Sequence, residues 1–131
     1  MSDTFTVEQA RTLIPWLQKT FDEMQPLIER LTDIRRYIED KSKLMRSNGG
    51  GNAETDIIQA GESLQKIDEE INQMVALIED RSVLVKNIQT GLFDFPYVMN
   101  GELVYLCWQA GERDLMYWHT IDSGFAGRQS L

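Results

Sequence analysis

The chain has 131 residues, of which 42% are hydrophobic and 26% charged, with a formal net charge of −8. This composition is typical of a globular domain with its own core, and an acidic balance without a Lys/Arg stripe argues against binding to nucleic acid or an anionic membrane. No apolar run is long enough to span a membrane, the N-terminus lacks the features of a signal peptide, and a single cysteine excludes an internal disulfide, so we expect a cytoplasmic protein.

The first predicted element is a long helix over residues 7–46. Thr6 and Gln9 have the spacing of a capping box at its start. Pro15 and Pro26 lie inside the helical pattern without changing its phase, so we expect kinks there; a break at Pro15 into two helices is the alternative. Apolar residues recur at steps of three and four, which indicates one buried face. This stripe consists of Ala10, Ile14, Leu17, Phe21, Met24, Ile28, Leu31 and Ile38.

A glycine-rich loop over residues 47–53 ends this helix. A second helix with its own apolar stripe is predicted over residues 54–81, and a short loop between two long helices favours an antiparallel hairpin. Gly61 lies inside the second helix, where it favours a close helix crossing. Arg35 and Arg81 fall on the stripes and either pair with carboxylates or extend to the rim.

Beyond the second helix the apolar pattern changes to that of strands. Asn100-Gly101 separates two β-branched and aromatic runs, which is the strongest short signal for a hairpin, and residues 110–114 read as a second turn. The predicted fold class is therefore α+β. We expect one domain in which the helical hairpin precedes an antiparallel sheet of three to four strands over residues 83–119 and an irregular tail over residues 120–131.

Both ends of the chain carry a further pattern. The residues are Phe5-Thr6-Val7-Glu8-Gln9-Ala10 and Leu13-Ile14-Pro15, then Thr90-Gly91-Leu92, Asp94-Phe95-Pro96, Val104-Tyr105-Leu106-Cys107-Trp108, Gly111-Glu112, Trp118-His119, Asp122, Gly124-Phe125-Ala126-Gly127-Arg128 and Leu131. With these residues the chain resembles a family of uncharacterised prokaryotic proteins, the domain-of-unknown-function family numbered 2203. The resemblance implies a small stand-alone protein of bacteria or archaea and no particular activity.

Five residues near the C-terminus form a candidate ligand or anion site. Alternation along the strands places Tyr105 and Cys107 on one face, and the tail or a partner must cover the aromatic residues that do not face the helices. Cys107 and His119 have the chemistry of a nucleophile and its base, the alternative being an inert packed thiol. The sequence does not identify catalytic residues. The five residues are Tyr105, Cys107, His119, Asp122 and Arg128.

The same region offers a weak metal set of His119, Asp122 and Asp94. In the alternative, Asp122 orients the His119 ring and the pair holds the tail on the sheet. Arg128 follows small residues whose backbone N–H groups suit an anion; alternatively it pairs with Asp94, Glu112 or Asp122.

Two functions are compatible with these features. The first is an interaction or scaffold protein that forms a homodimer through its helices, because a small sheet leaves part of their apolar stripes uncovered. The second is a protein that binds a small molecule, an anion or a metal on its C-terminal sheet and tail, with or without catalysis. An open polar pocket around His119, Asp122 and Arg128 favours the second function, and mutual pairing of these residues favours the first. The sequence identifies no cofactor.

Overall fold

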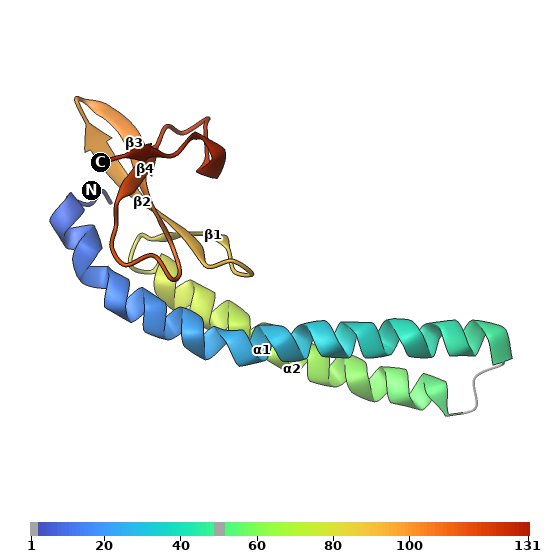
Figure 1. Cartoon of the computed structure of the whole chain (residues 1–131). Helices are drawn as coiled ribbons and strands as arrows, with labels where there is room; N and C mark the ends of the chain where they lie inside the picture. The colour runs from blue at the N-terminus through green and yellow to red at the C-terminus, as the bar shows by residue number, and fades with distance from the viewer. Residues whose placement is uncertain (1–2, 49–51) are drawn as a thin grey trace. The chain divides into compact units, whose positions relative to one another are not determined.

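The computed structural model describes residues 3–48 and 52–131. Two helices are followed by an antiparallel sheet, so the predicted α+β class with a helical hairpin is confirmed (Figure 1). The elements in chain order are α1 (Val7–Asn48), α2 (Ala53–Glu79), β1 (Leu84–Asn87), β2 (Leu92–Met99), β3 (Glu102–Gln109), β4 (Tyr117–His119), the 3-10 helix η1 (Phe125–Gly127) and β5 (Gln129–Ser130). The predicted glycine-rich loop falls in part on residues 49–51, which lie outside the described residues. No helix in the described part of the chain combines the length and apolar character that a membrane span requires.

The chain divides into two compact units. We call residues 3–22 together with 75–131 the sheet unit, and residues 23–74 the hairpin unit. In the hairpin unit, residues 23–48 of α1 and 53–74 of α2 form an antiparallel pair. The sheet unit contains the start of α1, the end of α2 and all five strands.

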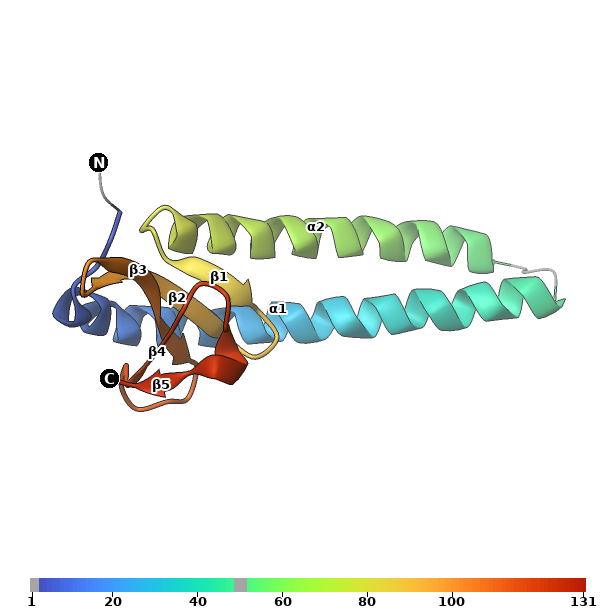
Figure 2. The ribbon, with the colours of Figure 1, turned by 90° about the horizontal axis from the view of Figure 1, so that it is seen from above.

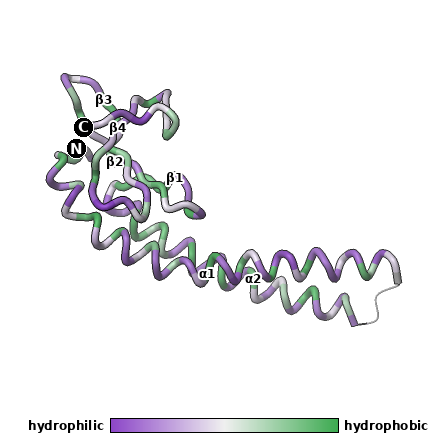
Figure 3. The backbone as a smooth tube through the Cα atoms, in the orientation of Figure 1, coloured by the Kyte–Doolittle hydropathy of each residue, from purple (hydrophilic) through white to green (hydrophobic). Residues whose placement is uncertain are grey.

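Helix α1 begins where the capping box predicts. The Thr6 backbone N–H donates to Gln9 Oε1 at 2.9 Å, and the Gln9 backbone N–H donates to Thr6 Oγ1 at 3.0 Å. The helix is continuous through Pro15 and Pro26, so the alternative of a break at Pro15 is wrong. The hydropathy colouring alternates along both helices (Figure 3), as expected for helices with one apolar face.

The predicted stripes form the core of each unit. In the sheet unit Ala10, Ile14, Leu17, Phe21 and Ile78 are buried. In the hairpin unit the buried stripe residues are Met24, Ile28, Leu31, Ile67 and Ile71.

Two local expectations for the helices have different outcomes. A methyl group added at Gly61 would meet no atom of another element within 4 Å, so the predicted close crossing there is wrong and nothing in the structure explains the glycine. Arg35 and Arg81 are both exposed, in agreement with the alternative in which these side chains extend to the rim of the stripe. The Arg81 guanidinium lies 4.3 Å from the centre of the Trp16 ring, a cation–π contact.

The sheet has the order β1-β2-β3-β4-β5, with every neighbouring pair antiparallel. The β2–β3 turn is the predicted Asn100-Gly101, and both residues have positive φ (53° and 82°), as a two-residue type I′ turn requires. The sheet has five strands, more than the three to four expected, because the tail is not irregular throughout. Gln129 and Ser130 pair with β4 as β5, and a two-residue strand leaves no periodicity in a sequence.

The two faces of the sheet have different surroundings. Phe93 and Phe95 lie on the face toward α1, where the Phe21 and Phe93 rings are 6.5 Å apart and the Phe5 and Phe95 rings 5.3 Å apart. Figures 1 and 2 show β2 and β3 lying over the first turns of α1. The opposite face carries Asp94 on β2, with the tail in contact with it. That second face holds most of the candidate site residues.

Candidate functional site

Three chemically reactive side chains meet on the face of the sheet away from α1. The β2–β3 register places Asp94 directly opposite Cys107. The β3–β4 register places His119 opposite Tyr105, two residues before Cys107, so all four side chains share one face. The ligand atoms of Asp94, Cys107 and His119 all lie within 4.8 Å of one another. These three residues are only 2%, 0% and 3% exposed.

The hydrogen bonds of His119 define its tautomer. Its Nδ1 lies 2.8 Å from the Thr120 carbonyl oxygen, which only accepts hydrogen bonds, so Nδ1 carries a proton. Its Nε2 lies 3.0 Å from Asp94 Oδ2. A lone pair on Nε2 facing a carboxylate oxygen at this distance would be repulsive. A proton or a metal cation must therefore lie between the two atoms.

Asp94 is only partly satisfied by its surroundings. Its second oxygen, Oδ1, is buried and has no hydrogen-bond partner among the described residues. A buried polar atom without a partner loses its hydration and gains nothing in return, which costs roughly 1–3 kcal/mol and more for a charged group. The alternative in which Asp122 orients His119 is wrong: the carboxylate partner of the ring is Asp94, and Asp122 is exposed.

Cys107 is a protonated thiol in this environment. Burial raises its pKa to about 12, and the negative charge of Asp94 adds to the effect while the positive charge of Arg128 opposes it. Nucleophilic catalysis needs the thiolate, and a thiol with this pKa does not supply it near neutral pH. The geometry thus favours the inert-thiol alternative over the Cys107–His119 nucleophile pair.

Arg128 pairs within the sheet unit through Nη2, while its buried Nε has no hydrogen-bond partner among the described residues. Its Nη2 donates to both Glu112 oxygens, at 2.6 and 2.9 Å, and to the Cys107 carbonyl at 3.3 Å. Its guanidinium lies 4.0 Å from the centre of the Tyr117 ring and 4.7 Å from that of Phe125. Glu112 is one of the three pairing partners that the sequence allows for Arg128. The tail therefore covers this face of the sheet, and the cation is not held open for an anion.

Of the five residues in the candidate site, the structure brings three close together. Cys107 and His119 belong to the buried cluster, and the Tyr105 ring lies 5.7 Å from the His119 ring. Arg128 approaches the cluster through the Cys107 carbonyl. The position of Asp94 beside Cys107 was detectable from the Asn100-Gly101 turn. Counting outward from that turn pairs Met99 with Glu102 and, five residues further along each strand, Asp94 with Cys107.

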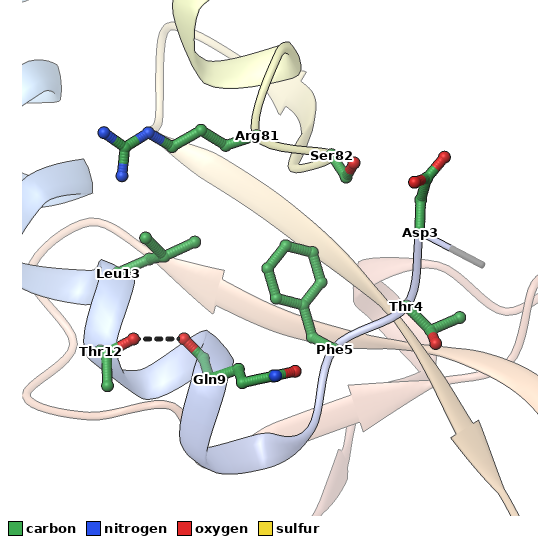
Figure 4. A pocket seen from close by; sticks show the side chains of 8 residues that line it. All are labelled: Asp3, Thr4, Phe5, Gln9, Thr12, Leu13, Arg81 and Ser82. Atoms are coloured by element: carbon green, nitrogen blue, oxygen red, sulfur yellow. Dashed lines mark hydrogen bonds between the residues drawn. The ribbon is translucent and has the colours of Figure 1, made fainter. Parts of the chain in front are cut away.

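Two open depressions of the sheet unit lie apart from this cluster. One, of about 390 Å³, is lined by the segment before α1, the first turns of α1 and the turn that follows α2 (Figure 4). Figure 4 shows the Phe5 ring at its centre, with Arg81 and Asp3 on separate sides. Its lining is Asp3, Thr4, Phe5, Gln9, Thr12, Leu13, Arg81 and Ser82. None of the five candidate residues is among them.

Comparison with known protein families gives a match over nearly the whole chain. The family DUF2203, described as an uncharacterized conserved protein, matches residues 3–131. No curated protein matches the chain. No solved structure matches it.

Proposed function

This chain belongs to the family DUF2203, and we propose that it acts as a dimeric interaction protein whose hairpin unit binds a second copy of the chain. The observation that carries this proposal is a second apolar stripe on α1. Within the sheet unit, Arg128 pairs with Glu112 and His119 pairs with Asp94. This is a second reason to prefer an interaction protein over a protein with an open ligand pocket.

The second stripe lies beside the buried one in the hairpin unit. Leu27, Ile34, Tyr37 and Leu44 follow one another at steps of seven, three and seven, the spacing of residues on one side of a helix that packs against another helix. Tyr37 is 43% exposed and Leu44 is 48% exposed. Each helix of an isolated hairpin uses one stripe to cover its partner, so a second stripe favours packing against further helices.

A groove runs beside this stripe. It has a volume of about 300 Å³, with Ile34 and Tyr37 from α1 and Ala60 from α2 in its lining. Arg30 and Asp56 add one charge of each sign. Gln59 and Ser63 complete the lining, so the groove combines apolar and polar groups, as the rim of a helix-binding surface does.

The charges of the hairpin unit favour a second copy as the occupant. Residues 23–48 contain six Lys and Arg and five Asp and Glu, whereas residues 53–74 contain one Lys and six Asp and Glu. In a two-fold arrangement with α1 of one copy against α2 of the other, the mildly basic helix faces the acidic helix twice. This complementarity contributes more to register and partner choice than to affinity.

The proposal is tested by the mass of the particle in solution. Sedimentation equilibrium of the whole chain should give about twice 15.1 kDa. Tyr37→Glu places an unpaired charge in the stripe and should shift the particle to the monomer mass, with a loss of affinity of at least about 100-fold. Circular dichroism should show that its helix content is retained.

The matched control is Ile58→Glu. Ile58 is 57% exposed on α2 and is not among the residues that line the groove. This variant introduces the same charge on the same unit and should keep the dimer mass. A monomer mass for the unmodified chain at all concentrations, or equal effects of the two substitutions, contradicts the proposal.

We also propose a cytoplasmic location and a prokaryotic origin. The single cysteine is a buried free thiol, which suits a reducing compartment, and the prokaryotic origin rests on the family resemblance. Fractionation of cells that produce the tagged chain tests the location: recovery with the cytoplasmic marker supports it, and recovery with the periplasmic or membrane marker contradicts it.

A further inference from the structure

We propose that Asp94, Cys107 and His119 bind one zinc ion inside the sheet unit. A thiolate, an imidazole and a carboxylate are the ligand types that zinc takes in proteins, and the thiolate disfavours magnesium and calcium. The three ligand atoms already lie within 4.8 Å of one another. Zinc bonds of about 2.0 to 2.3 Å set the donor atoms of one site roughly 3 to 4 Å apart, so small side-chain movements suffice.

His119 is oriented for metal binding. The Thr120 carbonyl accepts the Nδ1 proton at 2.8 Å, which leaves Nε2 as the nitrogen that faces Asp94 and Cys107. A histidine that binds a metal through one nitrogen usually donates the other N–H to a carbonyl or carboxylate, which fixes both the tautomer and the ring. Thr120 performs this orienting role here.

Asp94 supplies the independent observation that points to a ligand. Its Oδ1 is buried without a hydrogen-bond partner among the described residues, and the whole residue is 98% buried. A zinc ion gives this oxygen a partner. Asp94, Cys107 and His119 provide three protein ligands, as in zinc sites whose fourth position is taken by water or another ligand.

The charges balance when the ion binds. Without metal, the cluster contains one proton between Nε2 and Oδ2 and one on the thiol. One Zn²⁺ replaces these two protons, and the thiolate and carboxylate then neutralise the ion. Because the net charge of the buried cluster stays the same, binding adds no uncompensated charge to the interior. Metal binding should therefore release two protons per ion.

The competing arrangement is a buried histidine–aspartate pair beside an inert thiol. In that arrangement the thiol stays protonated and interacts with the Asp94 carboxylate, which also raises the thiol pKa. The two arrangements differ in one observable property, a bond between the Cys107 sulfur and the metal. This inference does not depend on the dimer, because all three ligands come from one chain.

The test uses cobalt as a spectroscopic probe for the zinc site. The whole chain is stripped of metal with a chelator and then titrated with Co²⁺, both as the native protein and during refolding from denaturant. We expect a thiolate-to-cobalt charge-transfer band that saturates at one ion per chain and disappears when Zn²⁺ is added. No such band in the folded wild-type chain under either condition overturns the proposal.

Three substitutions locate the ion. Cys107→Ser should abolish the charge-transfer band, and Asp94→Asn should weaken binding at least about 10-fold. Asp122→Asn is the matched control, because this exposed carboxylate lies in the same unit outside the cluster, and it should leave binding unchanged. An unchanged band in folded Cys107→Ser also overturns the proposal. The wild-type titration decides the question even where a variant fails to fold.

Discussion

The thiol of Cys107 contributes to stability in a way that depends on pH. Its pKa is raised from 9.0 to about 12, with burial as the largest cause. Above pH 9 an unfolded chain loses the thiol proton while the folded chain keeps it, so the unfolded state binds fewer protons and stability falls as pH rises toward 12. The loss is at most about 1.4 kcal/mol per pH unit.

Denaturant unfolding at a series of pH values from 8 to 11, with a chelator present, measures this dependence. Cys107→Ala is the reference, because other groups titrate in the same range and affect both proteins. We expect the free energy of unfolding of the wild type to fall more steeply with pH than that of the variant. Parallel curves would show that the thiol does not differ between the folded and unfolded states.

Gly91 is required for two separate reasons. Its φ is +74°, and a methyl group there would lie 2.6 Å from the Ala110 Cβ and 2.9 Å from the Phe21 ring. Gly101 has a similar φ of +82° but open space around it. The pair therefore separates backbone strain from steric overlap.

We expect Gly101→Ala to cost about 1 kcal/mol from strain alone, and Gly91→Ala roughly 3 kcal/mol because overpacking is added. Chemical denaturation of the two variants gives both values. Equal losses would mean that the Gly91 contact with Ala110 and Phe21 relaxes at no cost.

At the scale of elements, the tail is held on the sheet by Arg128. This residue connects the end of the chain to Glu112 and to the β3 backbone at Cys107, and it lies against the Tyr117 ring of β4. The ion pair is largely shielded from solvent, so removing one partner leaves the other charge without compensation.

A double-mutant cycle with Arg128→Met and Glu112→Gln should give a coupling energy of about 1–3 kcal/mol. Arg113→Met, which removes an exposed arginine in the same turn region, should change stability by less than about 0.5 kcal/mol. In the two single variants Cys107 should react faster with an alkylating reagent, because the tail opens more often. A coupling near zero would show that the tail is held by its other contacts.

The elements differ in how far the sequence predicts them. The helices follow from apolar steps of three and four, and the β2–β3 hairpin from Asn100-Gly101, because these signals are local. Strand β5 has two residues whose pairing with β4 depends on the fold of the whole unit, so no local pattern marks it.

The buried cluster illustrates the same limit at the level of side chains. Asp122 is close to His119 in sequence, whereas Asp94 is 25 residues away and reaches the ring through strand register. An inference from proximity in sequence therefore pointed to Asp122, although the carboxylate that contacts His119 is Asp94. The register that follows from the turn identifies Asp94 as the neighbour of Cys107.

At the scale of the molecule, the two units differ in where their functional groups lie. The sheet unit pairs most of its polar groups over a buried cluster. Among the described residues of this unit, Asp94 Oδ1 and Arg128 Nε are buried without a hydrogen-bond partner, and zinc would satisfy the first of them. The hairpin unit leaves Tyr37 and Leu44 exposed beside a groove. We therefore assign recognition of a second copy to the hairpin unit and metal binding to the sheet unit.

The central claim, that a second copy binds at the Tyr37 stripe, is tested most directly by the distance between two spin labels. Gln65→Cys places one label on the exposed side of α2, and the buried Cys107 stays unlabelled. Pulsed dipolar spectroscopy of this protein should give one narrow interspin distance, and adding Tyr37→Glu should abolish the dipolar signal. No dipolar signal in the singly labelled chain, or a signal that Tyr37→Glu leaves unchanged, would contradict the claim.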